Sequence, residues 1–250
     1  MILSKSKIKL INSLKIKKYR KIENLFFCEG KKIFETLLNS HFKIIEIFVT
    51  KKFIKNNENK LQFQYTEISD EEMKKISALT TPQDVLALVE IPKIEFKNQY
   101  LYESPILALD FIQDPGNLGT IVRIADWFGI KNIVCSKDTV DIFNPKAIQA
   151  TMGSIFSVNV FYVDFNVFLP NVKDIPIYGT LLEGENIYKT ELSKNGIILL
   201  GNEANGIRKI NQAHITKPIT IPNFNSQKKA ESLNVAISAA IVCSEFKRKQ

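Results

Sequence analysis

The feature that most constrains the fold is a series of short apolar runs in the second half of the chain, separated by helical or polar segments. The first run, Ile106 to Leu109, shows no alternation of polar and apolar residues, which is typical of a strand covered on both faces. Such strands, alternating with helices, form parallel α/β sheets. We therefore predict an α/β fold with a mostly parallel sheet, further strands at 133–135, 158–163, 177–180, 197–200 and 219–221, and a closing helix over 233–247.

The first part of the chain predicts a smaller α/β unit. Apolar residues at near-helical spacing among lysines predict one amphipathic helix over 8–21. Ser69 is predicted to cap a later helix, with Glu72 at the capping-box position. The stretch 91–105 is polar and flanked by prolines, which is the composition of a connection between domains. The predicted strands lie at 25–28, 44–49, 62–66 and 84–90, and the predicted organisation is a domain over 1–92, a linker over 93–104 and a second domain over 105–250.

Positive charge is concentrated at the amino-terminal end. The whole chain has a formal net charge of +8, and the first 60 residues hold 15 Lys and Arg against 5 Asp and Glu. Such an asymmetry favours a polyanionic partner such as nucleic acid, bound through its phosphates. An acidic membrane surface, or a lysine-rich face that is merely solvated, would give a similar count.

Several classes of protein are disfavoured because the sequence lacks the residues or patterns that they require. Cys28, Cys135 and Cys243 are widely separated among apolar neighbours, so we expect no disulfide framework. His41 and His214 are the only histidines and no paired cysteine spacing occurs, so no metal site and no His-dependent hydrolase is expected. No signal-peptide pattern and no apolar run of membrane-spanning length is present, so the expected compartment is the cytoplasm, with no membrane partner.

Three short motifs carry the functional hypothesis. They are Asn117 to Arg123, Gly201 to Glu203, and Ile221-Pro222 followed by Ser232 to Val235. Glycine allows close backbone approach, and a proline-terminated strand before a polar turn leaves a rim of backbone groups, so the motifs predict a cofactor pocket. Taken singly, each would also fit an ordinary capped helix or turn. No dinucleotide fingerprint and no P-loop is present, so neither common phosphate cradle is expected.

In this order and spacing the motifs resemble those of the SpoU/TrmH family, RNA ribose 2′-O-methyltransferases of the SPOUT class. The resemblance covers about 105–247, and a looser likeness extends to segments 24–30 and 81–85. It implies a SPOUT-type domain whose chain is tied in a deep trefoil knot, preceded by a smaller α/β domain that binds the RNA substrate. It also implies a homodimer through the knotted domain, with the closing helix and the helix of the first motif at the interface.

The resemblance also assigns a reaction, the transfer of a methyl group from S-adenosylmethionine to a ribose 2′-hydroxyl of structured RNA. We expect Arg123 to bind an RNA phosphate and stabilise the developing alkoxide, because a guanidinium with a pKa above about 12 is a poor general base. Glu203 is expected to orient Arg123 or the surrounding loops. Ala204-Asn205 before Gly206 departs from the commoner glycine-rich second motif. The implied catalytic residues are Arg123, Asn117, Glu203, Ser232 and Asn234, and the implied cofactor-binding residues are Thr180, Leu181, Gly201, Ile221, Pro222 and Leu233.

The sequence constrains the identity of the RNA substrate less than it constrains the reaction. We favour 23S ribosomal RNA over transfer RNA, because a separate substrate-binding domain accompanies ribosomal targets more often in this family. The alternatives are a transfer RNA 2′-O-methyltransferase of the same family, a non-catalytic RNA-binding or ribosome-assembly protein, and a small-molecule α/β enzyme that uses the same pocket.

Overall fold

The computed structural model describes residues 3–57, 63–225 and 232–248. The chain divides into two compact units, one made of residues 1–93 and 141–156, the other of residues 94–140 and 157–250. Residues 141–156 leave the second unit after Val140 and return to it at Ser157, an excursion that no sequence pattern indicates. The domain boundaries inferred from the sequence stay a prediction.

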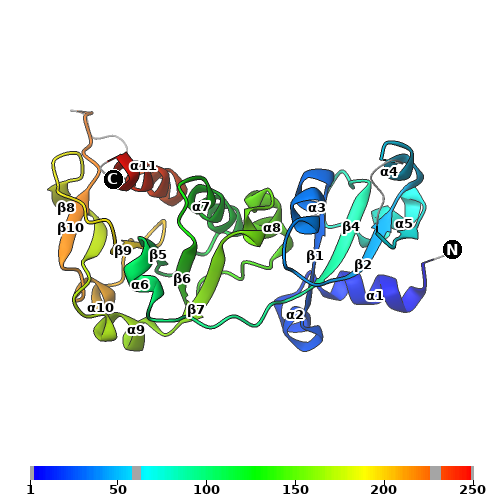
Figure 1. Cartoon of the computed structure of the whole chain (residues 1–250), viewed down its shortest axis with the longest axis horizontal. Coiled ribbons are helices and arrows are strands. Elements are labelled where there is room, and N and C mark those ends of the chain that lie inside the picture. The colour runs from blue at the N-terminus through cyan, green and yellow to red at the C-terminus, as the bar shows by residue number, and fades with distance from the viewer. Residues whose placement is uncertain (1–2, 58–62, 226–231, 249–250) are drawn as a thin grey trace. The chain divides into compact units, whose positions relative to one another are not determined.

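The second unit is built on a six-stranded sheet in which every neighbouring pair of strands is parallel (Figure 1). This confirms the predicted α/β fold with a mostly parallel sheet, whereas the predicted trefoil knot stays a prediction. Along the sheet the strands are β10 (Lys217–Thr220), β8 (Ile177–Asn186), β9 (Ile197–Leu200), β5 (Ile106–Leu109), β6 (Asn132–Ser136) and β7 (Asn159–Val163).

Helices cover both faces of this sheet. Ile106 and Ala108 pack in one core with Leu101 and Leu169, while the intervening Leu107 and Leu109 face the other side, since successive side chains of a strand point in opposite directions. On one side lie α6 (Tyr100–Glu103), α9 (Phe165–Asn171) and α10 (Lys209–Gln212); on the other, α7 (Pro115–Trp127) and α11 (Val235–Arg248) pack side by side (Figure 1).

Strand β8 is longer than predicted and irregular. Gly179 pairs with Pro218 of β10, and the register then jumps so that Glu185 pairs with Ile219. The residues between them, 180–184, therefore form a wide bulge in β8 opposite the edge strand β10. Gly184 belongs to this bulge, where a Cβ atom would lie 2.9 Å from the backbone of Ile219. The bulge thus holds β8 and β10 in close backbone contact.

The first unit is a four-stranded mixed sheet with helices on both faces. The strand order is β1-β4-β2-β3, and the buried faces of α1 and α5 share one core with β1, β2 and β4. The expected capping box is present, since Ser69 Oγ accepts from Glu72 N at 3.2 Å and Glu72 Oε2 accepts from Ser69 N at 2.9 Å. The elements are α1 (Lys5–Ser13), α2 (Lys17–Glu23), β1 (Leu25–Glu29), α3 (Lys31–Leu38), β2 (Ile44–Val49), α4 (Lys51–Lys55), β3 (Thr66–Glu67), α5 (Asp70–Ile76), β4 (Val85–Glu90), α8 (Pro145–Thr151) and the short η2 (Ser154–Phe156).

Two predictions for this unit were wrong in detail. The single helix expected over 8–21 is two helices, because α1 ends at Ser13 and α2 begins at Lys17. Arg20 Nη1 donates to the carbonyl of Leu14 at 2.7 Å and so satisfies an acceptor at the end of α1. The strand expected over 62–66 is confined to Thr66 and Glu67 where the chain is described.

The excursion 141–156 is held in the first unit by a buried charge and by aromatic contacts. Arg20, with 2% of its side chain exposed, donates from Nη2 to Asp141 Oδ2 at 2.6 Å. The Phe26 ring lies 4.7 Å from that of Phe143, measured between centroids, and Phe42 lies 5.1 Å from Phe156. No helix within the described parts of the chain is long and apolar enough to cross a membrane.

Candidate functional site

The first motif opens helix α7. Asp114 is the N-cap, and its Oδ1 accepts from the backbone N of Asn117 at 2.9 Å. Pro115 follows at the first helical position, where the missing N–H costs nothing. The apolar residues Leu118, Ile121 and Val122 are fully buried. The helix therefore holds Asn117 half-buried in its first turn and leaves Arg123 exposed.

The second motif is a tight loop directly after β9. The backbones of Asn202 and Gly206 exchange two hydrogen bonds of 2.9 Å. A Cβ atom on Gly201 would lie 2.1 Å from the backbone carbon of Gly206, so only glycine fits at this position. Asn202 Oδ1 accepts from the backbone N of Ala204 at 2.9 Å, and its Nδ2 donates to the carbonyl of Phe111 at 2.9 Å. The side chain of Asn202 thus ties the loop to the segment that follows β5.

Hydrogen bonds between side chains join all three motifs. Asn117 Nδ2 donates to Glu203 Oε1 at 2.8 Å, and Asn117 Oδ1 accepts from Asn234 Nδ2 at 3.0 Å. Asn234 Oδ1 also accepts from the backbone N of Ala236 at 2.9 Å, in the first turn of α11. We call Asn117, Glu203 and Asn234 the polar relay. It fixes the starts of two helices against one loop, although its members lie up to 117 positions apart in the sequence.

The predicted cofactor residues lie near points where regular strand pairing ends or α11 begins. Gly201 follows β9, Ile221 and Pro222 follow β10, Thr180 and Leu181 lie in β8 just after its regular pairing stops, and Leu233 precedes α11. Thr180 Oγ1 donates to the carbonyl of Leu199 in β9 at 3.1 Å, close in sequence to Gly201. Thr220 Oγ1 donates to the carbonyl of Leu182 at 3.1 Å, which brings the end of β10 to the β8 bulge. Beyond these hydroxyls the positions offer apolar side chains and backbone groups: Leu181, Ile221 and Pro222 are half-buried, and Leu233 is exposed.

These properties fit a nucleoside-like cofactor. Ligand pockets of this kind are lined mainly by apolar side chains, with a few backbone donors and acceptors that fix orientation. The ends of parallel strands are also the usual place for ligands in α/β sheets.

Two predicted catalytic residues stand outside the relay. Arg123 and Ser232 are both exposed, and no hydrogen bond or ion pair joins either to another described residue. The carboxylate of Glu203 is bonded by Asn117 and, at 3.3 Å, by Asn202. The sequence analysis expected Glu203 to orient either Arg123 or the surrounding loops. Its hydrogen bonds are to Asn117 in the first turn of α7 and to Asn202 in the second-motif loop, and none is to Arg123.

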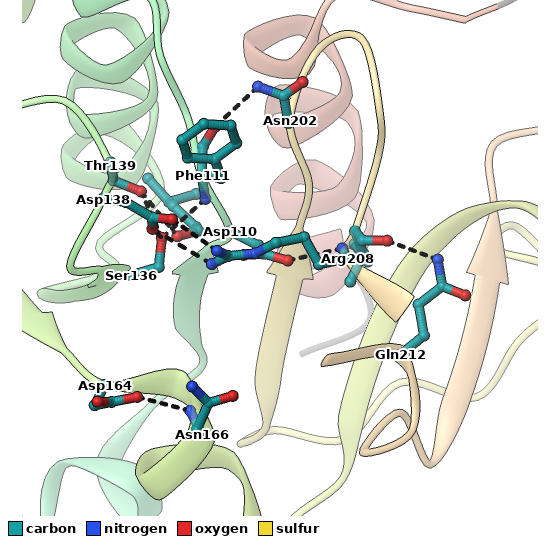
Figure 2. Close-up of polar contacts among 12 residues, drawn as sticks. Asp110, Phe111, Ser136, Asp138, Thr139, Asp164, Asn166, Asn202, Arg208 and Gln212 are labelled. Carbon is teal, nitrogen blue, oxygen red and sulfur yellow. Dashed lines mark hydrogen bonds and ion pairs between the residues drawn. The ribbon is translucent and has the colours of Figure 1, made fainter. Parts of the chain in front are cut away.

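A second charged network lies beside the relay and was not predicted. Asp110 is fully buried at the end of β5, and its carboxylate accepts from Nε of Arg208 at 2.7 Å and from the backbone N of Arg208 at 2.9 Å (Figure 2). Arg208 Nη1 donates to Asp138 Oδ2 at 2.7 Å. Partial burial opposes the charged guanidinium, but the hydrogen bonds and charges of both aspartates outweigh it and raise the pKa of Arg208.

One sequence signal could have indicated this network. An aspartate directly after an apolar strand is rarely buried without a cation, so Asp110 called for a partner. Nothing local marks Arg208 as that partner, 98 residues later.

Chemically, the site offers one exposed guanidinium and a fixed set of amide groups around a carboxylate. An exposed permanent cation suits a phosphate or a developing oxyanion. Within the described residues, no group of three or more His, Cys, Asp or Glu side chains is placed to hold a metal ion.

Comparison with known proteins defines the class. Residues 104–244 match the model of the SpoU rRNA Methylase family, and residues 5–87 match that of the MRM3-like substrate binding domain. The chain is 29% identical over 239 residues to the 23S rRNA (guanosine(2553)-2′-O)-methyltransferase RlmP of Bacillus subtilis, covering 94% of each chain.

Two solved structures match over nearly the whole length. A TrmH-family protein from Porphyromonas gingivalis is 34% identical, with a TM-score of 0.88 and full coverage of both chains. An rRNA methyltransferase from Sinorhizobium meliloti with bound AdoMet is 25% identical, with a TM-score of 0.83 and coverage of 99% and 97%. The fold and the matched motifs define a SpoU-type α/β protein. The chain belongs to the SpoU rRNA methylase family.

Proposed function

We propose that this protein transfers the methyl group of S-adenosylmethionine to a ribose 2′-hydroxyl of 23S ribosomal RNA. Family membership supports an RNA 2′-O-methyltransferase. The ribosomal substrate is supported by the similarity to RlmP, which extends through both units of the chain. The cofactor is supported by the AdoMet-bound relative and by the apolar and backbone groups in the β8 bulge and at the ends of β9 and β10.

The observation that carries the proposal is the polar relay, which fixes the first turn of the helix that also carries the exposed Arg123. Asn117 and Asn234 fix the first turns of α7 and α11 through bonds of 2.8 and 3.0 Å. Arg123, less than two turns along α7 from Asn117, is free to meet RNA on the exposed surface. A rigid helix start thus positions the cation, which supplies alignment before the reaction begins.

In the proposed reaction the ribose oxygen forms the new O–C bond as the S–C bond of the donor breaks, and the hydroxyl proton leaves to solvent. S-adenosylmethionine supplies the electrophilic methyl group. Arg123 keeps its own proton, binds the adjacent RNA phosphate and stabilises the negative charge that develops on the oxygen. Leu181, Ile221, Pro222 and Leu233 would hold the cofactor, and Glu203 would keep Asn117 and the second-motif loop in place.

Replacing Arg123 by alanine tests this role. We expect kcat for methyl transfer to 23S rRNA to fall by about 100- to 1000-fold, as when one donor to a developing oxyanion is removed. The melting temperature should stay unchanged, because the side chain is exposed. Transfer of tritiated methyl groups measures the rate, and Lys131→Ala removes another exposed cation of the same unit as the matched control. A wild-type rate in Arg123→Ala would refute the assignment.

The RNA target follows from a separate measurement. Mapping 2′-O-methyl groups on total RNA from cells with and without the gene should locate the lost mark in 23S rRNA, whereas a lost mark in transfer RNA would favour the other branch of the family. Binding of RNA without any transfer would favour an assembly protein instead.

We also propose a homodimer through the surface of α7 and α11. Trp127 on α7 is 84% exposed and Ile237 on α11 is 53% exposed, and these helices pack side by side (Figure 1). Exposed large apolar side chains on adjacent helices are typical of an interface. A monomeric mass by light scattering at micromolar concentration would contradict it. We further propose that the protein acts in the cytoplasm, as the sequence analysis expects.

A further inference from the structure

A polar hollow of about 400 Å³ lies at the carboxyl ends of β6 and β7. Its walls include Asp138, Asp164, Asn166 and Arg208, which Figure 2 shows around one opening, and also Asn211. The predicted cofactor residues are not part of its lining. Its volume is within the range of small-ligand sites.

Asn211 is the observation that points to a ligand. Its side chain is 2% exposed, and its Nδ2 is the one buried side-chain nitrogen or oxygen in the described chain without a hydrogen-bond partner. Its backbone N is satisfied by the carbonyl of Arg208 at 2.8 Å, so only the side-chain donor is left over. Buried amide donors are normally bonded, and an unmet one in a native protein calls for an explanation. A ligand acceptor in the hollow would provide it once the Asn211 amide, which is closed to solvent in the free protein, turns toward the ligand.

The other polar groups of the hollow add acceptors and balance the charge. Lys137 Nζ donates to Asp164 Oδ2 at 3.0 Å, and this bond lowers the pKa of Asp164. Arg208 in turn neutralises Asp138 at 2.7 Å. The two carboxylates keep unused lone pairs. Because Arg208 is shared with the buried Asp110, the surroundings of the hollow carry no surplus of positive charge. A neutral ligand with donors and acceptors on one edge suits this lining better than an anion does.

We propose that the hollow takes one unstacked, amino-bearing base of the substrate RNA, with the base amino group donating to the carboxylates and a ring acceptor bonded by Asn211 Nδ2. Adenine, cytosine and guanine carry such an edge, whereas uracil lacks the amino group. Apolar surface is supplied by Ile210 and Phe165 of the lining, and single-stranded RNA is commonly read through splayed-out bases. The proposal rests on the proposed RNA-methylating function and names part of its substrate recognition.

The hollow is connected to the polar relay by hydrogen bonds. Ser136 Oγ, at the wall of the hollow, accepts from the backbone N of Phe111 at 2.9 Å. The carbonyl of Phe111 accepts from Asn202 Nδ2, which also lies 3.3 Å from Glu203 Oε2. A base in the hollow would thus be held against the same loop that carries Glu203.

The first test is independent of methyl transfer. Adenosine, cytidine, guanosine and uridine are titrated separately into the ¹⁵N-labelled full-length protein, and the side-chain amide signals of Asn211 are followed by NMR. We expect saturable shifts with at least one amino-bearing nucleoside and weaker binding of uridine. In Asn211→Leu, which removes the donor at similar volume, binding is followed through the side-chain amide signals of Asn166 in the same hollow. It should weaken by about three- to tenfold, the value of one hydrogen bond. No shift with any nucleoside, or equal binding by the leucine variant, overturns the proposal.

The second test separates an RNA base from a free nucleoside. In methyl transfer to 23S rRNA, Asn211→Leu should raise the KM for RNA by about three- to tenfold, while kcat and the Kd for S-adenosylmethionine stay at wild-type values. If Asn211 served the fold alone, the variant would lose stability and keep the wild-type KM. Because its side-chain donor is unmet in the free protein, we expect the variant to be as stable as wild type or more so. Asn171→Ala, on the exposed end of α9, is the control. Failure of the wild-type protein to methylate RNA would refute the proposed function, whereas the nucleoside titration would still decide the hollow.

Discussion

Two side-chain networks join distant parts of this chain, one in each unit. Their hydrogen bonds are of similar length, but the side chains differ in burial. The polar relay of Asn117, Glu203 and Asn234 has bonds of 2.8 and 3.0 Å between groups that are half-buried or exposed. The bond from Arg20 to Asp141 is 2.6 Å, and the arginine side chain is 2% exposed. Similar distances therefore have different energetic consequences.

This difference in burial determines whether a network mainly stabilises the fold or mainly positions groups for the reaction. A buried charge that loses its partner is strongly destabilising, so the pair of Arg20 and Asp141 fixes where the excursion 141–156 packs. Water can replace a lost bond in the relay, so its individual bonds add little stability. Its use lies in fixing the geometry around Arg123, and changes there should affect the rate of methyl transfer more than folding.

The largest effect is expected from breaking the buried pair. Arg20→Ala should destabilise the unit of residues 1–93 and 141–156 by about 3–5 kcal/mol, because Asp141 is left without its cation and the carbonyl of Leu14 loses a donor. Amide hydrogen exchange in β1 and α8 measures the loss locally, and methyl-transfer assays measure its cost to function.

Two further variants test that explanation. Lys43→Ala breaks an exposed pair of 2.8 Å with Glu90 and should change stability by less than about 1 kcal/mol. Replacing Arg20 by Met and Asp141 by Leu together removes both charges and should restore much of the lost stability. Equal effects of Arg20→Ala and Lys43→Ala would show that burial does not separate the two kinds of contact.

The sequence predicted the sheet of the second unit well because its signals are local. Uniform apolar runs such as Ile106 to Leu109 are buried on both faces in any parallel sheet, and all six expected strands of this unit exist. The boundaries moved where strand pairing rather than composition decides them. Strand β8 runs to Asn186 through a bulge that depends on β10.

The missed features are all long-range. The Arg20 guanidinium bonds both Asp141, at the start of the excursion 141–156, and the carbonyl of Leu14, where the first helix ends. No local sequence pattern could predict these contacts, because the partners of Arg20 lie elsewhere in the chain. Arg208 and Asn211 were missed for the same reason: their roles arise from Asp110 and from a hollow between strand ends. Asn117, Glu203 and Asn234 were found through the family resemblance, whereas their direct hydrogen bonds required the structure.

An intermediate effect is expected when charge is introduced into the relay. In Asn117→Asp the donor to Glu203 becomes a second carboxylate at a distance of 2.8 Å, and repulsion should cost about 1–3 kcal/mol at neutral pH. The facing carboxylates raise the folded-state pKa of one of them. The penalty is therefore present above that raised pKa and fades as the pH falls toward the unfolded value of about 4.

Urea unfolding of Asn117→Asp and wild type between about pH 5 and pH 8 measures this trend. The methyl-transfer rate should fall by about tenfold or more, since the start of α7 is displaced. Asn98→Asp adds the same charge on an exposed segment and serves as the control. A stability difference that does not vary with pH would mean that the two carboxylates do not interact.

The smallest effect is expected at a contact that resembles the relay but serves folding only. Glu72 Oε2 accepts from the backbone N of Ser69 at 2.9 Å and Oε1 from that of Leu3 at 2.6 Å. These bonds lower the pKa of Glu72, so its contribution is present above the ordinary value of about 4.3 and is lost as the pH falls through the lower folded value. Glu72→Gln should cost about 0.5–1 kcal/mol at pH 7, with no change in kcat. Exposed Glu67→Gln is the control, and a difference from wild type that persisted at pH 3 would show that side-chain shape, rather than charge, supplies the cap.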